Sequence, residues 1–150
     1  MSDSGYKIAI ADTQFLVIEA LKSLLGNDKR FSTIEIVSSY YELHKFLEKE
    51  SCQLLIIDFA LFDSDSVVDL QKIKQKFPDL AILVLTNSIN KTEFTELSKI
   101  GIKNIIYKTA EHDEIFSAID ATLRGKKFYS EEILDMILEL GESKSVPEEP

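Results

Sequence analysis

Four short apolar runs in this chain each lead into a side chain suited to phosphate chemistry. The runs cover residues 8–11, 54–57, 81–85 and 105–107, and the side chains that follow them are Asp12, Asp58, Thr86 and Lys108. Nearly continuous apolar runs separated by helix-length segments are typical of buried parallel strands, and ligands of such sheets bind beyond the carboxyl ends of the strands. The sequence therefore predicts that two carboxylates, a hydroxyl and an ammonium group converge on one edge of a parallel sheet.

Strand-like and helix-like segments alternate along the chain, which is the pattern of a βα-repeating domain. The apolar runs predict strands over residues 6–11, 33–37, 53–57, 80–85 and 103–107. Apolar residues at helical spacing predict helices over 15–25, 41–49, 67–77, 92–100 and 113–124. Right-handed crossovers between the strands then give an α/β fold, a five-stranded parallel sheet with helices on both faces.

The carboxyl-terminal part of the chain has a different character. Ser130 is a candidate cap for a short helix over 131–140, whose apolar residues cover more than one face. The remaining residues, rich in Glu, Ser and Pro, are typical of a flexible linker. We therefore expect a main domain over 1–126, a helix with the start of a linker over 127–141, and a flexible linker or tail over 142–150.

Composition limits the classes of function. A length of 150 residues with 45% hydrophobic residues suits one domain, and a net charge of −9 disfavours a broad nucleic-acid or anionic-membrane surface. The single cysteine, Cys52, excludes an internal disulfide, and no apolar stretch is long enough to export or anchor the chain, so we expect a cytoplasmic protein. His44 and His112 have no second ligand at metal-binding spacing and are expected to be plain surface residues.

The order of these motifs carries a family resemblance. Ala11-Asp12, Leu55-Ile56-Ile57-Asp58, Val84-Leu85-Thr86 and the segment from Gly101 to Lys108 together resemble the receiver domain of a two-component response regulator, over about residues 7–125. The resemblance implies a flavodoxin-like (CheY-like) doubly wound sheet with strand order 2-1-3-4-5, five helices and a short C-terminal helix. Residues 124–130 resemble the junction that leads, in LuxR-type transcriptional regulators, to a helix-turn-helix domain that this chain lacks. DNA contact is therefore expected only through such an output domain.

The resemblance also implies roles for the residues at the strand ends. Asp58 is expected to accept a phosphoryl group from a histidine kinase. Asp12, Asp58 and the backbone carbonyl of Ala60 are expected to hold Mg²⁺, while Thr86 donates to a phosphoryl oxygen and Lys108 pairs with the carboxylate and then with the phosphoryl group. The chain is thus expected to receive signals rather than to act as an enzyme on a metabolite.

Three positions depart from the family pattern. Thr13 stands where receivers usually carry a second acidic residue, which predicts weakened Mg²⁺ binding. Ile105 replaces the usual switch aromatic, and Tyr107 is not expected to take over its role. Thr109 follows Lys108 where proline is frequent, so a trans peptide bond is open there. These departures keep an alternative open: a pseudo-receiver that acts through protein contacts without phosphorylation.

Apolar residues on the first and last predicted helices indicate a surface that binds a partner. The first helix begins with the apolar residues 15–18, and not all of them can face the sheet. Together with the apolar last helix, this indicates a homodimer or a docking surface. The alternative is that the last helix folds back onto the first and covers both surfaces.

Overall fold

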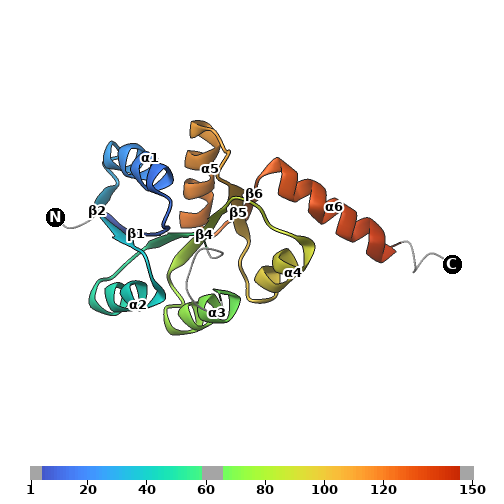
Figure 1. Cartoon of the computed structure of the whole chain (residues 1–150), viewed down its shortest axis with the longest axis horizontal. Coiled ribbons are helices and arrows are strands. Elements are labelled where there is room, and N and C mark those ends of the chain that lie inside the picture. The colour runs from blue at the N-terminus through green and yellow to red at the C-terminus, as the bar shows by residue number, and fades with distance from the viewer. Residues whose placement is uncertain (1–4, 59–65, 146–150) are drawn as a thin grey trace.

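A parallel sheet forms the centre of the molecule (Figure 1). The computed structural model describes residues 5–58 and 66–145, with the backbone alone for 66 and 141–145. Within this part of the chain the strand order is β2-β1-β3-β4-β5-β6, with every neighbouring pair parallel. The strands are β1 (Tyr6–Ala11), β2 (Phe31–Val37), β3 (Leu54–Ile57), β4 (Ala81–Thr86), β5 (Asn104–Tyr107) and β6 (Phe128–Tyr129).

The predicted doubly wound fold and its 2-1-3-4-5 order are confirmed, with one addition. The two-residue strand β6 extends the sheet beyond β5, and it pairs Phe128 with Asn104 and Tyr129 with Ile105. The side-chain amide of Asn104 donates to the backbone carbonyl of Lys126 at 2.7 Å, which fixes the chain just before β6. A strand this short has no periodic signature, because two residues cannot show an alternation.

Helices cover both faces of the sheet (Figure 1). Helices α1 and α5 lie on one face, and α2, α3 and α4 lie on the other. Two helices begin with side-chain caps: Ser39 accepts from the backbone N–H of Glu42, and Asn90 forms a capping box with Glu93. The helices are α1 (Phe15–Gly26), α2 (Tyr40–Lys49), α3 (Ser66–Lys76), α4 (Lys91–Lys99), α5 (His112–Leu123) and α6 (Glu131–Ser145).

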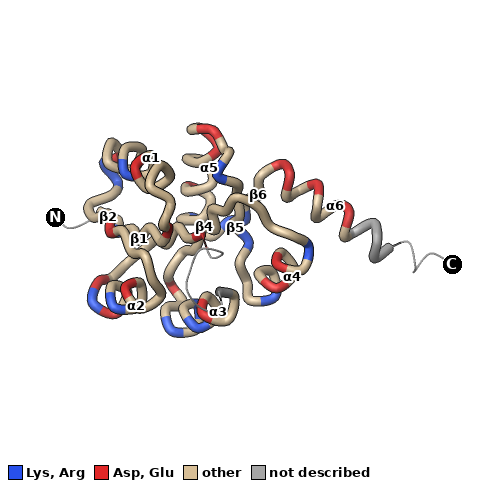
Figure 2. Tube along the Cα trace, viewed as in Figure 1, with Lys and Arg blue, Asp and Glu red and all other residues tan. Residues whose placement is uncertain are grey.

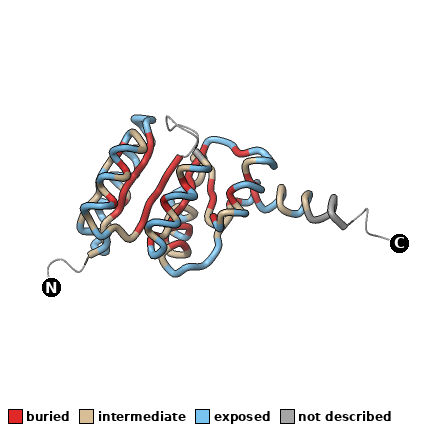
Figure 3. The backbone as a smooth tube through the Cα atoms, turned by 90° about the horizontal axis from the view of Figure 1, so that it is seen from below, coloured by how far each residue is buried: buried red, intermediate tan, exposed pale blue. Residues whose placement is uncertain are grey.

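Alternation along the strands divides the apolar core into two layers. Ile8 and Ile10 of β1 pack toward α1 and α5, whereas Ala9 and Ala11 pack toward α2, α3 and α4. All four are fully buried, and the strands form the buried centre in Figure 3. A strand buried on both faces reads as a continuous apolar run, which explains why the sequence revealed the strands so directly.

Helix α6 projects from the body beyond the α4 side of the sheet (Figure 1). It ends at Ser145, so it includes residues 142–145, which the sequence analysis assigned to the linker; residues 146–150 lie outside the described part. Ile133 is fully buried in the core layer beside α4, and Lys91 Nζ lies 3.2 Å from Glu139 Oε1. The alternative that the last helix folds back onto the first is therefore wrong, because α6 packs on the face opposite α1.

Acidic residues recur along the described part of α6, as Figure 2 shows. No helix in the described part of the chain is long and apolar enough to cross a membrane.

Candidate functional site

Two aspartates are brought together by the pairing of β1 with β3. Ala11 and Ile57 are partners in register, so the next residues, Asp12 and Asp58, emerge side by side. The backbone N–H of Asp58 also donates to the carbonyl of Ala11 at 3.0 Å. Both residues are almost fully buried, with 2% and 1% of their surface exposed. The predicted convergence of these carboxylates is thus present.

Lys108 lies between the two carboxylates. Its Nζ is 2.6 Å from Asp58 Oδ2 and 2.9 Å from Asp12 Oδ2, and only 5% of its side chain is exposed. Burying a lone charge is costly, but a cation shared by two carboxylates offsets part of the desolvation of all three groups. The arrangement leaves one negative charge in excess, which suits a site that attracts a divalent cation.

Gln14 joins this cluster, although the sequence analysis did not single it out. Its Oε1 accepts from Lys108 Nζ at 2.5 Å and from Asn87 Nδ2 at 3.4 Å, and its backbone N–H donates to Asp12 Oδ1 at 2.8 Å. The last contact is the turn that an aspartate makes with the N–H two residues later. That local rule could have indicated where Gln14 lies, but not that its side chain reaches Lys108.

Thr86 reaches the same edge but turns its hydroxyl elsewhere. The residue is 1% exposed, and its Oγ1 donates to the carbonyl of Ser88 at 3.1 Å. Its own carbonyl accepts from the backbone N–H of Lys108 at 2.9 Å, which fixes the start of the lysine side chain. The threonine is therefore placed beside the cluster, with its hydroxyl outside the ion-pair network.

The residues present fit a Mg²⁺ ion held by few protein ligands. Asp12 and Asp58 are the carboxylates that would hold it, and Mg²⁺ commonly takes one or two carboxylates together with water and phosphate oxygens. Thr13 is exposed and carries no charge, and Ala60 lies outside the described residues. No group of three or more acidic, histidine or cysteine side chains at metal-binding distance occurs among the described residues.

The other two departures from the family pattern, Ile105 and Thr109, both lie in or just after β5. Ile105 is fully buried in the core layer beside α4. Tyr107 packs against the same layer, because residues two apart on a strand share a face, so the expectation that it cannot stand in for Ile105 lacks a geometric basis. Tyr107 also pairs in register with Thr86, and burial raises the pKa of its phenol. The peptide bond between Lys108 and Thr109 is trans.

The two histidines make contacts outside the cluster of Asp12, Asp58 and Lys108. His44 contacts Glu48 and the rings of Tyr40 and Phe77, and His112 is exposed beside Asp113. That neither histidine is a metal ligand remains a prediction.

The fold and the buried Asp–Asp–Lys cluster at the carboxyl edge of the sheet define the class of two-component receiver domains. The family described as "Response regulator receiver domain" matches residues 8–120, so the chain belongs to this family.

Individual relatives and solved structures agree with this family. The chain is 24% identical over 128 residues to the response regulator protein VraR of Staphylococcus aureus, covering 85% of this chain and 61% of the relative. The isolated receiver domain of RcsB from Salmonella enterica, solved with the phosphomimetic BeF3⁻, superposes with a TM-score of 0.78 at 24% identity, covering 87% of this chain and 97% of that one. The structure of a LuxR-family response regulator from Aurantimonas superposes with a TM-score of 0.80 at 19% identity, covering 91% of this chain and 97% of that one. The chain thus spans about three-fifths of the length of the curated relatives that it matches.

Proposed function

We propose that this chain is the signal-receiving part of a response regulator and accepts a phosphoryl group on Asp58 from a histidine kinase. The observation that supports it is the contact of 2.6 Å between Lys108 Nζ and the Asp58 carboxylate, beside the second carboxylate of Asp12. This arrangement supplies a nucleophile, a fixed positive charge and a candidate metal position at one sheet edge. The cytoplasm, where histidine kinases expose their phosphodonor groups, is the compartment we propose for it.

The proposed transfer forms one bond to phosphorus and breaks another. An Asp58 carboxylate oxygen attacks phosphorus, the bond from phosphorus to the donor nitrogen breaks, and an acyl phosphate forms while the donor imidazole leaves. Bound Mg²⁺ would supply charge neutralisation for the phosphoryl oxygens, and Asp12 and Asp58 are its candidate ligands. Lys108 shifts its pairing from the carboxylate to a phosphoryl oxygen, and Thr86 donates its hydroxyl to another after giving up the carbonyl of Ser88.

Intact-protein mass spectrometry after incubation with acetyl phosphate and Mg²⁺ tests the proposal. We expect one added phosphoryl group on the native chain and on Asp79→Asn, whose carboxylate lies exposed at the opposite end of the sheet. Asp58→Asn is expected to show none. Labelling that persists in Asp58→Asn would show that another residue is the acceptor.

A second candidate function is a pseudo-receiver that acts through protein contacts without phosphorylation. Two observations favour it: Thr13 leaves the cluster with two carboxylates, and Lys108 already pairs with both of them and with Gln14. No labelling of the native chain, under conditions that label an ordinary receiver, would support this candidate and contradict the first.

We also propose a homodimer as the output of the domain, with DNA contact through an output domain as in regulators of this type. Phe15 and Leu16 at the start of α1 are 71% and 79% exposed, and Leu134 and Leu138 on α6 are 46% and 64% exposed. Helices α1 and α6 lie on opposite sides of the molecule in Figure 1, so the two patches belong to separate surfaces. Sedimentation of Leu16→Glu and Leu138→Glu, with and without phosphorylation, would identify which patch is used; a monomer at all concentrations would contradict a dimer.

A further inference from the structure

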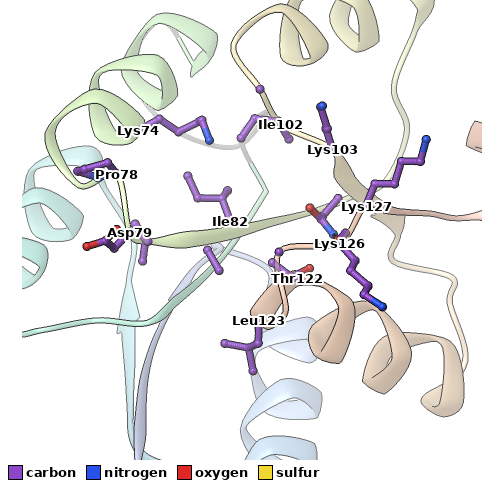
Figure 4. A pocket seen from close by; sticks show the side chains of 15 residues that line it. Lys74, Pro78, Asp79, Ile82, Ile102, Lys103, Thr122, Leu123, Lys126 and Lys127 are labelled. Atoms are coloured by element: carbon purple, nitrogen blue, oxygen red, sulfur yellow. Dashed lines mark hydrogen bonds between the residues drawn. The ribbon is translucent and has the colours of Figure 1, made fainter.

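A cavity of about 310 Å³ lies at the amino ends of β4 and β5, opposite the carboxyl-edge cluster (Figure 4). Its walls are the chain segments that lead into β4, β5 and β6, together with the last turns of α3 and α5. A strand advances about 3.3 Å per residue, so the six residues of β4 separate this cavity from the carboxyl edge by roughly 20 Å. The cavity is therefore a place distinct from Asp58, and what it binds does not depend on phosphoryl transfer.

Part of the cavity wall is apolar. Ile82 and Ile102 are 6% and 2% exposed, and both line the cavity with Leu123 (Figure 4). A concave site that combines an apolar wall with charged groups can hold a small molecule, and a volume of about 310 Å³ is at the lower end of the usual range for such sites.

Four lysines surround this apolar wall, and Asp79 is the one carboxylate among the lining residues. The four are Lys74, Lys103, Lys126 and Lys127. None of them forms a salt bridge with another described residue, whereas other lysines of this acidic chain, such as Lys7 and Lys76, lie within 2.7 Å of a carboxylate oxygen. In a chain with 26 acidic and 17 basic residues, four lysines at one cavity without a salt bridge to any described residue form a local reversal of charge.

Gly101 allows one of these lysines to approach the cavity closely. Its φ is +90°, a conformation that favours glycine, and a Cβ there would lie 3.3 Å from Lys74 Cε and 3.6 Å from Lys74 Nζ. The Lys74 side chain extends from α3 toward Ile102, while Lys103, Lys126 and Lys127 lie on the far side (Figure 4). In Figure 4 the Lys74 side chain points toward the cavity, whereas the ammonium groups of Lys103, Lys126 and Lys127 point outward and would have to turn to reach a ligand there.

We propose that this cavity binds a small organic phosphate, with its organic part against Ile82 and Ile102 and its phosphate oxygens paired with the lysines at the opening. The lysines are point charges on flexible stems, so they can turn toward the phosphate oxygens without a fixed geometry. The chain as a whole repels anions at a net charge of −9, so any such binding must come from these local charges.

A titration of the ¹⁵N-labelled full chain with phenyl phosphate tests the proposal. EDTA is added so that metal-dependent chemistry at Asp58 does not contribute. We expect saturable shifts of the backbone amides in residues 101–104 and 125–127. Inorganic phosphate and phenol, the two halves of the probe, are expected to bind at least about tenfold more weakly, because each engages one of the two kinds of wall.

The variant Lys74→Gln is expected to weaken phenyl phosphate binding about fivefold. Lys72→Gln is the matched control, because it removes the same charge from an exposed position two residues away that does not line the cavity. Equal weakening by both variants, shifts confined to the surroundings of Lys108, or the absence of saturable shifts would each overturn the proposal. Inorganic phosphate binding as tightly as phenyl phosphate would overturn the assignment to an organic ligand.

Discussion

At the carboxyl ends of the strands one lysine, Lys108, lies buried between two carboxylates, whereas at the amino ends four lysines surround a cavity with only Asp79 among them. The first group is closely paired and removed from water, so its charges depend on one another. The second group is largely exposed, so its charges are screened and nearly independent. Substitution of a single charge should therefore have large effects at the first end and small effects at the second.

The largest effect is expected from Lys108→Met. Removing Lys108 takes away the cation that the buried carboxylates of Asp12 and Asp58 share, which should lower the free energy of unfolding by about 3–5 kcal/mol at neutral pH. Urea unfolding followed by circular dichroism measures the loss. The matched control, Lys103→Met at the amino end, is expected to change stability by less than about 0.5 kcal/mol. Similar losses in both variants would remove the contrast between the two ends.

Cys52, just before β3, shows what burial does to an acid at the amino end, where the charge of Lys7 only partly offsets the desolvation. Desolvation raises the pKa of its thiol to about 11, and its Sγ lies 3.3 Å from the carbonyl oxygen of Leu54. At pH 8 we expect alkylation by iodoacetamide to be about a hundredfold slower in the native chain than in urea, because the thiolate is scarcer.

The raised pKa of Cys52 also makes the free energy of unfolding depend on pH. Between about pH 9 and 11 the unfolded thiol loses its proton while the native thiol keeps it, so this group makes stability fall as pH rises through that window. Alkylation at equal rates in the native chain and in urea would show that Cys52 is not protected.

A smaller effect is expected from restoring charge at the carboxyl edge. Thr13→Asp adds a third carboxylate next to Asp12 and should strengthen Mg²⁺ binding about tenfold, measured by calorimetry. Ser23→Asp, which adds the same charge at an exposed position on α1, is expected to leave Mg²⁺ affinity unchanged. An increase of Mg²⁺ affinity in both variants would show that the net charge of the chain, rather than the position of the added carboxylate, determines binding.

The smallest of these effects concerns Gln14. Gln14→Ala removes an acceptor of Lys108 Nζ and should cost about 1 kcal/mol of unfolding free energy. Gln71→Ala, on the exposed surface of α3, serves as the control and should be nearly neutral. No loss in Gln14→Ala would mean that the amide adds nothing to the ion pairs already present.

The sequence was sufficient to predict the sheet and most of the carboxyl edge, for a physical reason. Parallel strands that are buried on both faces must be apolar throughout, and their ends must meet at one edge, so Asp12, Asp58 and Lys108 could be placed together before any coordinates. The roles assigned to these residues and to Ala60 remain predictions.

Other features depended on contacts that no local pattern records. The direction of the Thr86 hydroxyl and the contact of Gln14 with Lys108 depend on how loops from different strands pack. Strand β6 depends on a side-chain bond from Asn104 to the backbone of Lys126, 22 residues away. The cavity at the amino ends is built from segments near residues 79, 102 and 126, and only the fold brings their lysines together.

Helix α6 extends the molecule beyond the edge of the sheet (Figure 1). Its fifteen residues make it about 22 Å long at 1.5 Å per residue, and its base is fixed by β6, where the Tyr129 ring lies 5.8 Å from that of Phe94 on α4. A tilt of roughly 10° at this base would displace the far end of the helix by about 4 Å. Because Lys91 of α4 also contacts Glu139 of α6, a rearrangement of α4 too small to alter the core would be transmitted along α6 to its far end.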